Sequence, residues 1–220
     1  MQRIFDILLS LTAIIFLSPI LVPVVFILKM TGEGEIFYKQ KRVGIHGAEF
    51  NVLKFATMLK NSPNIGSGEI TLKNDPRVLP FGKFLRKSKI NELPQLFNIL
   101  FGEMSVVGPR PMVPNTYSFY DKFAQDTLNK IRPGLTGIGS IIFRDEEKFL
   151  ENKKDPIDFY RKNIIPYKSS LEIWYVDNLS LIMYFKCILS TALIVAFPQT
   201  RLHLKFFKGL PEMPNILKQP

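Results

Sequence analysis

Residues 7–28 form the feature that most constrains this chain, a run of 22 residues without a charge. A helix of this length can cross a hydrocarbon core of roughly 30 Å. Pro19 and Pro23 fall inside the run, and each removes one helical hydrogen bond. The Ser18 hydroxyl can satisfy a backbone carbonyl freed in this way. The run therefore predicts a kinked helix, which either spans the membrane or bends at Ser18-Pro19 and returns to the same face.

The composition describes a basic and apolar protein. The chain has 220 residues, of which 46% are hydrophobic, and its 29 Lys and Arg against 19 Asp and Glu give a net charge of +10. A positive surface attracts polyanions, so nucleic acid, anionic membrane lipids and pyrophosphate-bearing substrates are all candidate partners. The single cysteine, Cys187, cannot form an intramolecular disulfide, which favours a cytosol-facing protein.

A second apolar run covers residues 179–197 and is interrupted by Lys186 and Ser190, which share one helical face. It predicts a helix that lies in the membrane interface, spans the membrane a second time or is buried in a core. The alternation of basic and apolar residues in 201–208 suits a headgroup region. We accordingly divide the chain into a membrane helix (1–31), a cytosolic catalytic domain (32–178), an interfacial helix region (179–208) and a tail (209–220).

Between the two apolar runs the pattern predicts a small α/β domain. Short strands are expected at 36–38 and 49–55, around a turn at 44–47 that contains two glycines. Helices are expected within 77–89 after Pro80, at 94–101 between a proline and a glycine, and at 115–130.

Residues 91–111 carry the strongest chemical signal. Asn91 and Glu92 come just before the helix predicted at 94–101, and a helix N-terminus is a natural site for phosphate oxygens. Pro109 and Pro111 fix φ on both sides of Arg110, whose planar guanidinium matches phosphate oxygens. Taken separately, Asn91 or Glu92 could simply cap the helix, and Arg110 could lie in an exposed turn.

Taken together, NELPQLFNILFGEMSVVGPRP at 91–111 closely resembles the signature of the bacterial sugar transferases, the small monotopic phosphoglycosyl transferases. Further matches follow in order over roughly residues 1–200. They are Gln40-Lys41-Arg42-Val43-Gly44 with Gly47, Phe50, Lys54 and Phe55; Asp75-Pro76-Arg77 with Gly82, Leu85 and Arg86; and Arg132-Pro133-Gly134-Leu135-Thr136-Gly137. The resemblance implies a monotopic α/β membrane protein with a re-entrant helix broken at Ser18-Pro19. Its small catalytic domain would rest on interfacial amphipathic helices at the cytoplasmic face of the bacterial inner membrane.

The resemblance also implies the reaction, transfer of a hexose-1-phosphate from a UDP-sugar to undecaprenyl phosphate, which initiates a surface glycan. It implies Mg²⁺ as the cofactor, with Glu92 as a metal ligand, and anionic membrane lipids as further partners. Nucleic acid is not expected, and the oligomeric state stays open, with a homodimer as one option. The candidate substrate or phosphate ligands are Arg42, Lys54, Arg77, Arg86, Pro109, Arg110 and Arg132.

The chain departs from the family pattern at several positions. The family has an Asp nucleophile where this chain has Asn91, a basic residue where it has Ala56, and an Asp where it has Tyr184. An acidic cluster that is absent from the pattern follows Thr136-Gly137, and it supplies either auxiliary acids or an ordinary solvated helix start. The cluster consists of Asp145, Glu146 and Glu147.

Asn91 leaves three hypotheses, because an amide is a poor nucleophile. In the first, Glu92 is the nucleophile. In the second, the transfer is direct, and Glu92 or an acid of 145–147 orients the acceptor phosphate. In the third, the chain is weakly active or inactive and acts as a scaffold in glycan assembly. A membrane-tethered nucleic-acid-binding protein is the remote alternative, motivated by the net charge alone.

Overall fold

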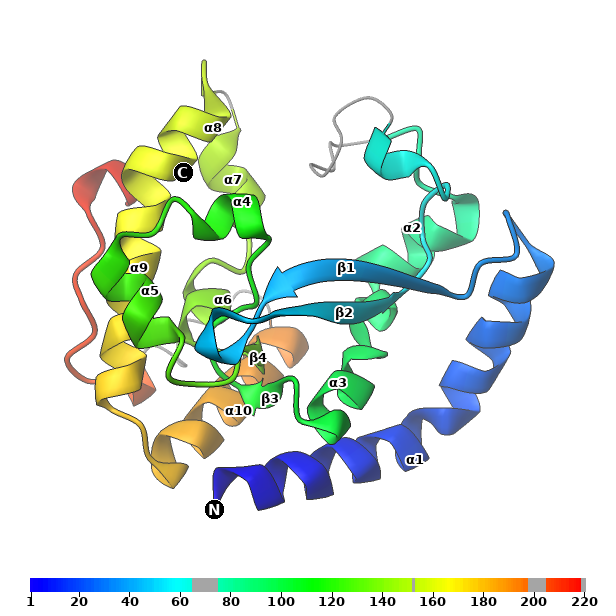
Figure 1. Cartoon of the computed structure of the whole chain (residues 1–220), viewed down its shortest axis with the longest axis horizontal. Coiled ribbons are helices and arrows are strands. Elements are labelled where there is room, and N and C mark those ends of the chain that lie inside the picture. Colours follow the sequence, from blue (N-terminus) through cyan, green and yellow to red (C-terminus); the bar gives the residue numbers. More distant parts are fainter. Residues whose placement is uncertain (65–74, 152, 198–204, 219–220) are drawn as a thin grey trace. The chain divides into compact units, whose positions relative to one another are not determined.

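The computed structural model describes residues 1–64, 75–151, 153–197 and 205–218, without the side chains of Pro63 and Glu147. The chain forms two compact units. The first comprises residues 1–6, 42–50 and 102–220, and the second comprises 7–41 and 51–101. Both helices and strands are present, as predicted for an α/β protein (Figure 1). The domain boundaries inferred from composition stay a prediction.

Helix α1 (Gln2–Met30) contains the charge-free run and is long and apolar enough to cross a membrane by length and composition. Figure 1 shows that it bends along its length. Pro19 cannot donate to the carbonyl of Ile15, and the Ser18 hydroxyl donates to that oxygen instead, at 2.8 Å. The Ser18 contact and the bend agree with the predicted kink, while the path of the helix relative to a membrane stays a prediction.

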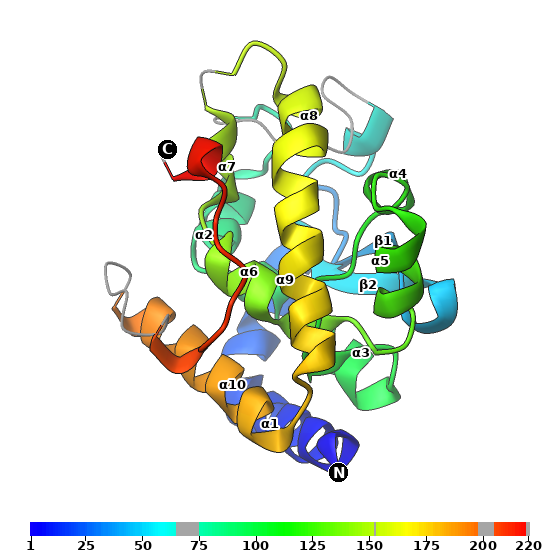
Figure 2. The same ribbon diagram turned by 90° about the vertical axis from the view of Figure 1, so that its left-hand side faces the viewer.

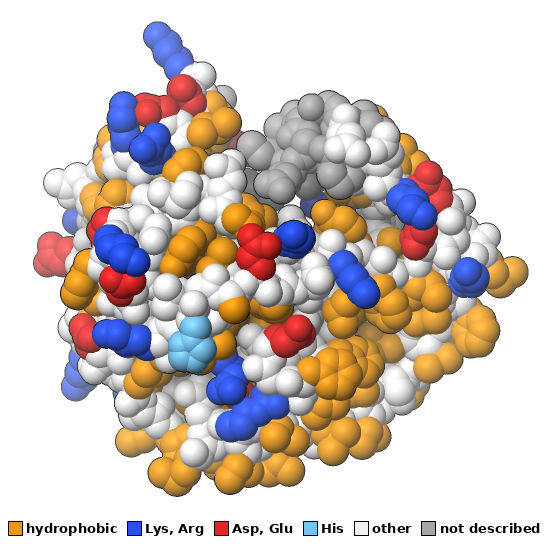
Figure 3. Space-filling view, viewed as in Figure 1, with side chains coloured by type: hydrophobic (Ala, Val, Ile, Leu, Met, Phe, Trp, Pro, Cys, Tyr) orange, Lys and Arg blue, Asp and Glu red, His pale blue; other side chains and the backbone are white. Residues whose placement is uncertain are grey.

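The second half of α1 packs on one side and is exposed on the other. Leu21, Val24 and Leu28 are buried in the core of the second unit, together with Phe55 and Leu85. Apolar side chains such as Ile15, Phe16 and Phe26 are instead 64%, 81% and 63% exposed. Hydrophobic side chains gather over α1 in Figure 3. A continuous apolar surface of this kind marks contact with lipid or with another protein.

Two strands, β1 (Phe37–Val43) and β2 (Glu49–Phe55), form a two-stranded sheet. They confirm the predicted strands, and the turn between them contains a 3-10 segment (Ile45–Gly47). The second unit continues with a 3-10 turn (Ser62–Asn64), α2 (Pro80–Lys87), a 3-10 turn (Ile90–Glu92) and α3 (Gln95–Phe101). Asn91 and Glu92 thus lie just before α3, as predicted, and the segment that contains them is a 3-10 turn.

In the first unit a short parallel sheet joins β3 (Ser105–Val107) to β4 (Gly134–Thr136), with Ser105 opposite Gly134. The single helix predicted at 115–130 is wrong. The structure has α4 (Pro114–Tyr117) and α5 (Lys122–Leu128), and Asp121 caps α5 by accepting a hydrogen bond from the Ala124 amide at 2.8 Å. A side chain that caps the start of a new helix favours that start over continuation of the preceding helix, so the segment is divided into two helices.

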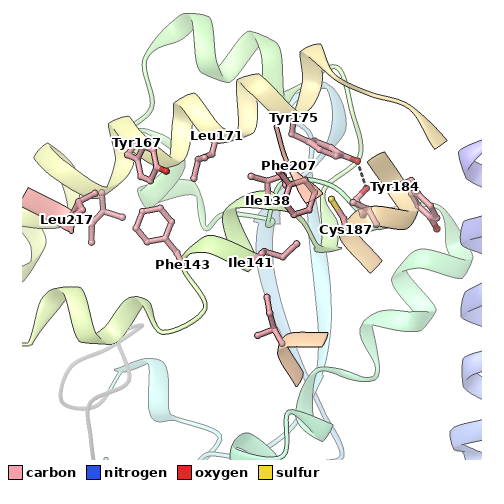
Figure 4. Packing of buried hydrophobic residues seen from close by; sticks show 13 residues of the cluster. Ile138, Ile141, Phe143, Tyr167, Leu171, Tyr175, Tyr184, Cys187, Phe207 and Leu217 are labelled. Carbon is pink, nitrogen blue, oxygen red and sulfur yellow. Dashed lines mark hydrogen bonds between the residues drawn. The ribbon is translucent and has the colours of Figure 1, made fainter. Parts of the chain in front are cut away.

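The core of the first unit lies around a long helix. The short α8 (Pro156–Phe159) continues through a π-turn (Tyr160–Ile164) into α9 (Ile165–Asp177). Figure 2 shows α9 with α6 (Ile138–Ile142) and α10 (Leu181–Ala196) beside it. In Figure 4, Tyr167, Leu171 and Tyr175 of α9 meet side chains of α6 and α10. The remaining helical segments are α7 (Glu146–Leu150) and a 3-10 turn (Asn215–Leu217).

Helix α10 confirms that residues 179–197 are helical. Its buried side chains include Tyr184, Cys187 and Ile194, while Ile182 and Val195 are each 69% exposed. With 16 residues it spans about 24 Å at the rise of an α-helix, which is short for a hydrocarbon core. Of the basic-apolar continuation at 201–208, residues 201–204 lie outside the described residues.

A buried carboxylate joins the start of α1 to the short parallel sheet. Asp6 is 2% exposed, and its Oδ1 accepts hydrogen bonds from the Ser105 hydroxyl, the Val106 amide and the Tyr184 hydroxyl, each at 2.9 Å. Gln2, one turn earlier, donates to the Ser105 hydroxyl and the Val107 carbonyl. Three donors on one oxygen satisfy a charge that would otherwise be costly to bury.

We expect Asp6→Ala to lower the free energy of unfolding by about 3 kcal/mol, because it leaves buried donors without an acceptor. Tyr184→Phe removes one donor and should cost about 1 kcal/mol. Asp126, an exposed acid on α5, gives the matched control, and Asp126→Ala should change stability by less than about 0.5 kcal/mol. Denaturant unfolding in detergent measures all three, and equal losses for Asp6→Ala and Asp126→Ala would contradict this account.

A second buried acid, Glu172 of α9, lies against α6. A Cβ on Gly139 would come within 2.2 Å of its Oε1, so the carboxyl group lies directly against the Gly139 backbone. Its Oε2 has no hydrogen-bond partner among the described residues. Burial raises the pKa of the Glu172 carboxyl to about 7, although Lys168 and the Gly139 backbone act in the opposite direction.

The stabilising effect of a neutral Glu172 should therefore be present in full below pH 4.5 and be lost as the pH rises through 7. Relative to Glu172→Gln, which stays neutral, the native chain should lose roughly 3 kcal/mol of unfolding free energy between pH 4.5 and 8.5. Unfolding of both proteins across this pH range measures the difference. Parallel stability profiles would show that the carboxylate does not ionise in the core.

Candidate functional site

A cavity of about 460 Å³ lies within the second unit. Four of the residues predicted from the sequence line it together, namely Lys54, Arg86, Asn91 and Glu92. They come from three different elements, β2, α2 and the 3-10 turn at Ile90–Glu92. The structure therefore brings the centre of the predicted site together.

Lys54 is held in place through its neighbour in β2. The Asn98 side chain, on α3, accepts a hydrogen bond from the Leu53 amide at 2.9 Å and donates one to the Asn51 carbonyl at 2.8 Å. This buried amide pairs with β2 as another strand would, because it offers one donor and one acceptor. The strand that carries Lys54 is thus fixed to α3.

Arg86 is placed by a close approach of α2 to residue 57. A Cβ on Gly82 would lie 2.2 Å from the Thr57 carbonyl oxygen, so glycine is required there. The same oxygen accepts a hydrogen bond from the Leu79 amide at 3.0 Å. One turn further along α2, the Arg86 guanidinium donates to the Thr57 hydroxyl at 3.4 Å, a long hydrogen bond.

Asn91 is buried, with 8% of its surface exposed, and its Oδ1 has no hydrogen-bond partner among the described residues. The 3-10 turn that contains it follows Lys89, whose backbone is left-handed (φ 60°, ψ 9°). Glu92 ends the turn and is partly buried. The amide and the carboxylate are therefore adjacent on the wall of one cavity.

The described lining of the cavity is strongly basic. Its cations are Lys39, Lys54, Lys60, Arg86 and Lys89, and its acids are Glu35 and Glu92. Glu35 and Lys60 form an ion pair at 2.7 Å. The hydrogen bond from Lys60, and then its charge, lower the pKa of Glu35, and the same contact raises the pKa of Lys60. The remaining excess of positive charge suits a ligand with two or more negative charges.

Sequence reasoning missed Lys39, Lys60 and Lys89 as cavity residues. Lys39 and Lys60 follow no motif, and their basic side chains are of a kind that is common on protein surfaces. Nothing in the residue type of Lys89 predicts a left-handed backbone, because lysine has no preference for that conformation.

The first unit contains the GPRP segment. The Gly108 amide donates to the Thr136 carbonyl at 2.8 Å, and the Gly134 amide donates to the Pro109 carbonyl at 2.7 Å. Arg42 donates to the Pro111 carbonyl at 3.0 Å. Arg110 is exposed and lies with Pro109 at a small depression of about 20 Å³. The segment is therefore a rigid frame that presents one arginine, as predicted.

Two further predicted phosphate ligands, Arg77 and Arg132, donate hydrogen bonds to the protein itself, as Arg42 and Arg86 do. Arg77 is 4% exposed, donates to both oxygens of Asp75 at 2.9 and 2.6 Å, and donates to the Ser62 carbonyl at 2.7 Å. The hydrogen bond with Asp75 raises the pKa of Arg77. Arg132, in the first unit, donates to the Gly102 carbonyl at 2.7 Å. These contacts give Arg77 a structural role.

The acidic cluster lies at the start of a helix, which is one of the two alternatives predicted for it, the other being auxiliary catalytic acids. Asp145 precedes α7 and pairs with Lys148 at 2.8 Å, and Glu146 pairs with the mostly buried Lys168 at 2.7 Å. The side chain of Glu147 lies outside the described part of the chain.

The described residues contain no group of three or more His, Cys, Asp or Glu that could hold a metal ion by themselves. Glu92 offers a carboxylate on the cavity wall, next to the buried side chain of Asn91. Mg²⁺ is commonly bound by one or two carboxylates together with substrate phosphates and water. The cavity therefore fits a magnesium ion that arrives with a phosphate ligand.

The profile of the bacterial sugar transferase family matches residues 1–198. The exopolysaccharide production protein ExoY of Sinorhizobium fredii is 39% identical over 162 residues, which cover 67% of this chain and 71% of that protein. The exopolysaccharide production protein PSS of Rhizobium leguminosarum bv. phaseoli is 31% identical over 196 residues, covering 87% of this chain and 92% of that protein.

A longer relative is the UDP-glucose:undecaprenyl-phosphate glucose-1-phosphate transferase of Klebsiella pneumoniae. It is 37% identical over 163 residues, which cover 72% of this chain but 34% of that protein. The match of the family profile to nine-tenths of the chain and the level of identity lead to one conclusion. This chain belongs to the bacterial sugar transferase family.

Proposed function

We propose that this protein transfers a hexose-1-phosphate from a UDP-sugar to undecaprenyl phosphate, the initiating step of a surface glycan. The observation that carries the proposal is the basic cavity, which gathers Lys54, Arg86, Asn91 and Glu92. Its charge and size suit the pyrophosphate of a nucleotide-sugar. The names of the Klebsiella relative and of the exopolysaccharide production proteins support this reaction.

The membrane attachment is part of the proposal. The bent α1 would enter the membrane and return to the same face, because its kink lies near the middle of the charge-free run. The exposed apolar face of α10 would lie in the interface. The net charge of +10 suits anionic headgroups, and this supports a catalytic domain that would rest at the cytoplasmic face of the bacterial inner membrane.

Magnesium is the proposed cofactor, and Glu92 with the Asn91 amide oxygen would hold it together with phosphate oxygens. When bound, the ion would neutralise charge on the transferring phosphate. The basic side chains of the cavity do the same work from the protein side, as fixed positive charges around the phosphate.

Glu92 is the group that we propose to carry the chemistry. Its carboxylate would attack the β-phosphorus of the UDP-sugar, so that a carboxylate–phosphorus bond forms and the bond to the leaving UMP breaks. An oxygen of undecaprenyl phosphate would then attack the same phosphorus and release Glu92. Glu92 already lines the cavity beside Asn91, so the shift by one residue needs no rearrangement of the chain.

The reaction is tested by a panel of UDP-sugars, assayed for UMP release with undecaprenyl phosphate and Mg²⁺ in detergent. We expect at least one UDP-hexose to release UMP in a manner that depends on the acceptor. A panel without any UMP release would favour the second candidate, a scaffold in a glycan-assembly complex, for which the neutral Asn91 is the motivating observation.

Two substitutions test the chemistry at the dyad. Glu92→Gln should lower UMP release by at least about a hundredfold, since it removes the carboxylate but keeps the shape. Incubation with a UDP-sugar alone should add one hexose phosphate to the native chain, detectable by intact-protein mass spectrometry and absent in Glu92→Gln. Turnover without the adduct would instead support direct transfer. An inactive native chain whose activity appears in Asn91→Asp would support the scaffold.

A further inference from the structure

Lys89 has an unusual backbone for its residue type. Among the described residues, Lys89 (φ 60°) and His46 (φ 59°) are the non-glycine residues with a positive φ. A lysine in the left-handed region brings its Cβ close to the following carbonyl, so glycine or asparagine would be more stable there. Strained backbones of this kind persist where the surrounding structure holds them, and they are frequent at functional sites.

The backbone contacts of Lys89 explain the conformation of the turn, but they do not explain why the residue is a lysine. Its amide donates to the Arg86 carbonyl at 3.2 Å, and its carbonyl accepts from the Glu92 amide at 3.1 Å. The left-handed residue thus ends α2 and begins the 3-10 turn that carries Asn91 and Glu92. Glycine would make the same turn without strain, so the side chain itself calls for another explanation.

The Lys89 side chain lines the same cavity as Arg86 and Asn91. Within residues 1–64, 75–151, 153–197 and 205–218, no Asp or Glu forms an ion pair with its ammonium group. An exposed lysine elsewhere on a surface would simply be solvated. Here the charge stands at the wall of a basic cavity, two residues from the buried and unpartnered oxygen of Asn91.

We propose that Lys89 is a phosphate-binding residue, whose ammonium group contacts the phosphate that reacts beside Asn91 and Glu92. This inference rests on the proposed function. A lysine provides a compact positive charge, and transfer of a phosphoryl group depends mainly on positioning and on such charges. The phosphate belongs either to the pyrophosphate of the UDP-sugar or to undecaprenyl phosphate, because the two present the same oxygens.

Substitution of Lys89 distinguishes a role of its backbone from a role of its side-chain charge. Removing the backbone strain should raise stability, whereas removing the charge should weaken phosphate binding. Lys89→Gly and Lys89→Asn should raise the thermal unfolding temperature, since both residues adopt the left-handed conformation more easily. They should also weaken UDP binding about tenfold, whereas Lys89→Arg should keep the affinity within about twofold. Calorimetric titration with UDP and thermal unfolding in detergent measure the two effects on the same samples.

His46→Gly is the matched control. It relieves the same backbone strain, and His46 is not among the residues that line the cavity. This variant should raise the unfolding temperature without changing the affinity for UDP. A loss of UDP affinity in His46→Gly as large as in Lys89→Gly would assign the effect to the backbone and overturn the proposal.

The source of the phosphate follows from a second measurement, the KM for undecaprenyl phosphate at saturating UDP-sugar. A weaker affinity for UDP assigns Lys89 to the donor, and a raised acceptor KM with unchanged UDP affinity assigns it to the acceptor. If Lys89→Gly raises stability and changes neither quantity, the inference is wrong while the proposed function stands. A native chain that neither binds UDP nor releases UMP would contradict the proposed function, and this inference with it.

Discussion

The buried carboxylate of Asp6 is the interaction on which the first unit depends most. Its oxygen gathers donors from β3 and from α10, residues about a hundred and nearly two hundred positions away in the chain. An acid at the start of an apolar helix has few acceptable environments, because an unpaired buried charge costs several kcal/mol. The requirement to satisfy it fixes β3, and β3 leads directly into the GPRP segment. The start of α1 is thereby connected to the frame that presents Arg110.

The second unit achieves the same precision with close backbone approaches. Gly82 lets α2 touch residue 57, and the Asn98 amide substitutes for a neighbouring strand beside β2. These contacts are short and directional, so they hold Lys54 and Arg86 with little freedom. Long basic side chains lose conformational entropy when they bind a ligand, and a fixed base for each reduces that loss.

The sequence pattern correctly predicted those elements that depend only on neighbouring residues in the chain. The kink of α1, with Ser18 beside Pro19, follows from a missing amide and a nearby hydroxyl, and both are visible in the sequence. Strands β3 and β4 have three residues each and exist because the chain pairs them across 29 positions, which no local alternation reveals. The break before Asp121 and the long helix α9 were missed because capping and tertiary burial outweighed the local propensities. For the site, the motifs identified Lys54, Arg86, Asn91 and Glu92, while the cavity's other lysines depended on the fold.

The structure also separates the departures from the family pattern into two kinds. Tyr184 donates to Asp6, and this contact gives the tyrosine a structural reason that is unrelated to catalysis. Ala56 and Asn91 are 7% and 8% exposed, and both line the cavity. Relative to the family pattern, the first replaces a basic residue and the second replaces an acid. At these two positions the changes cancel in charge, and Glu92, which matches the pattern, is left as the carboxylate next to Asn91.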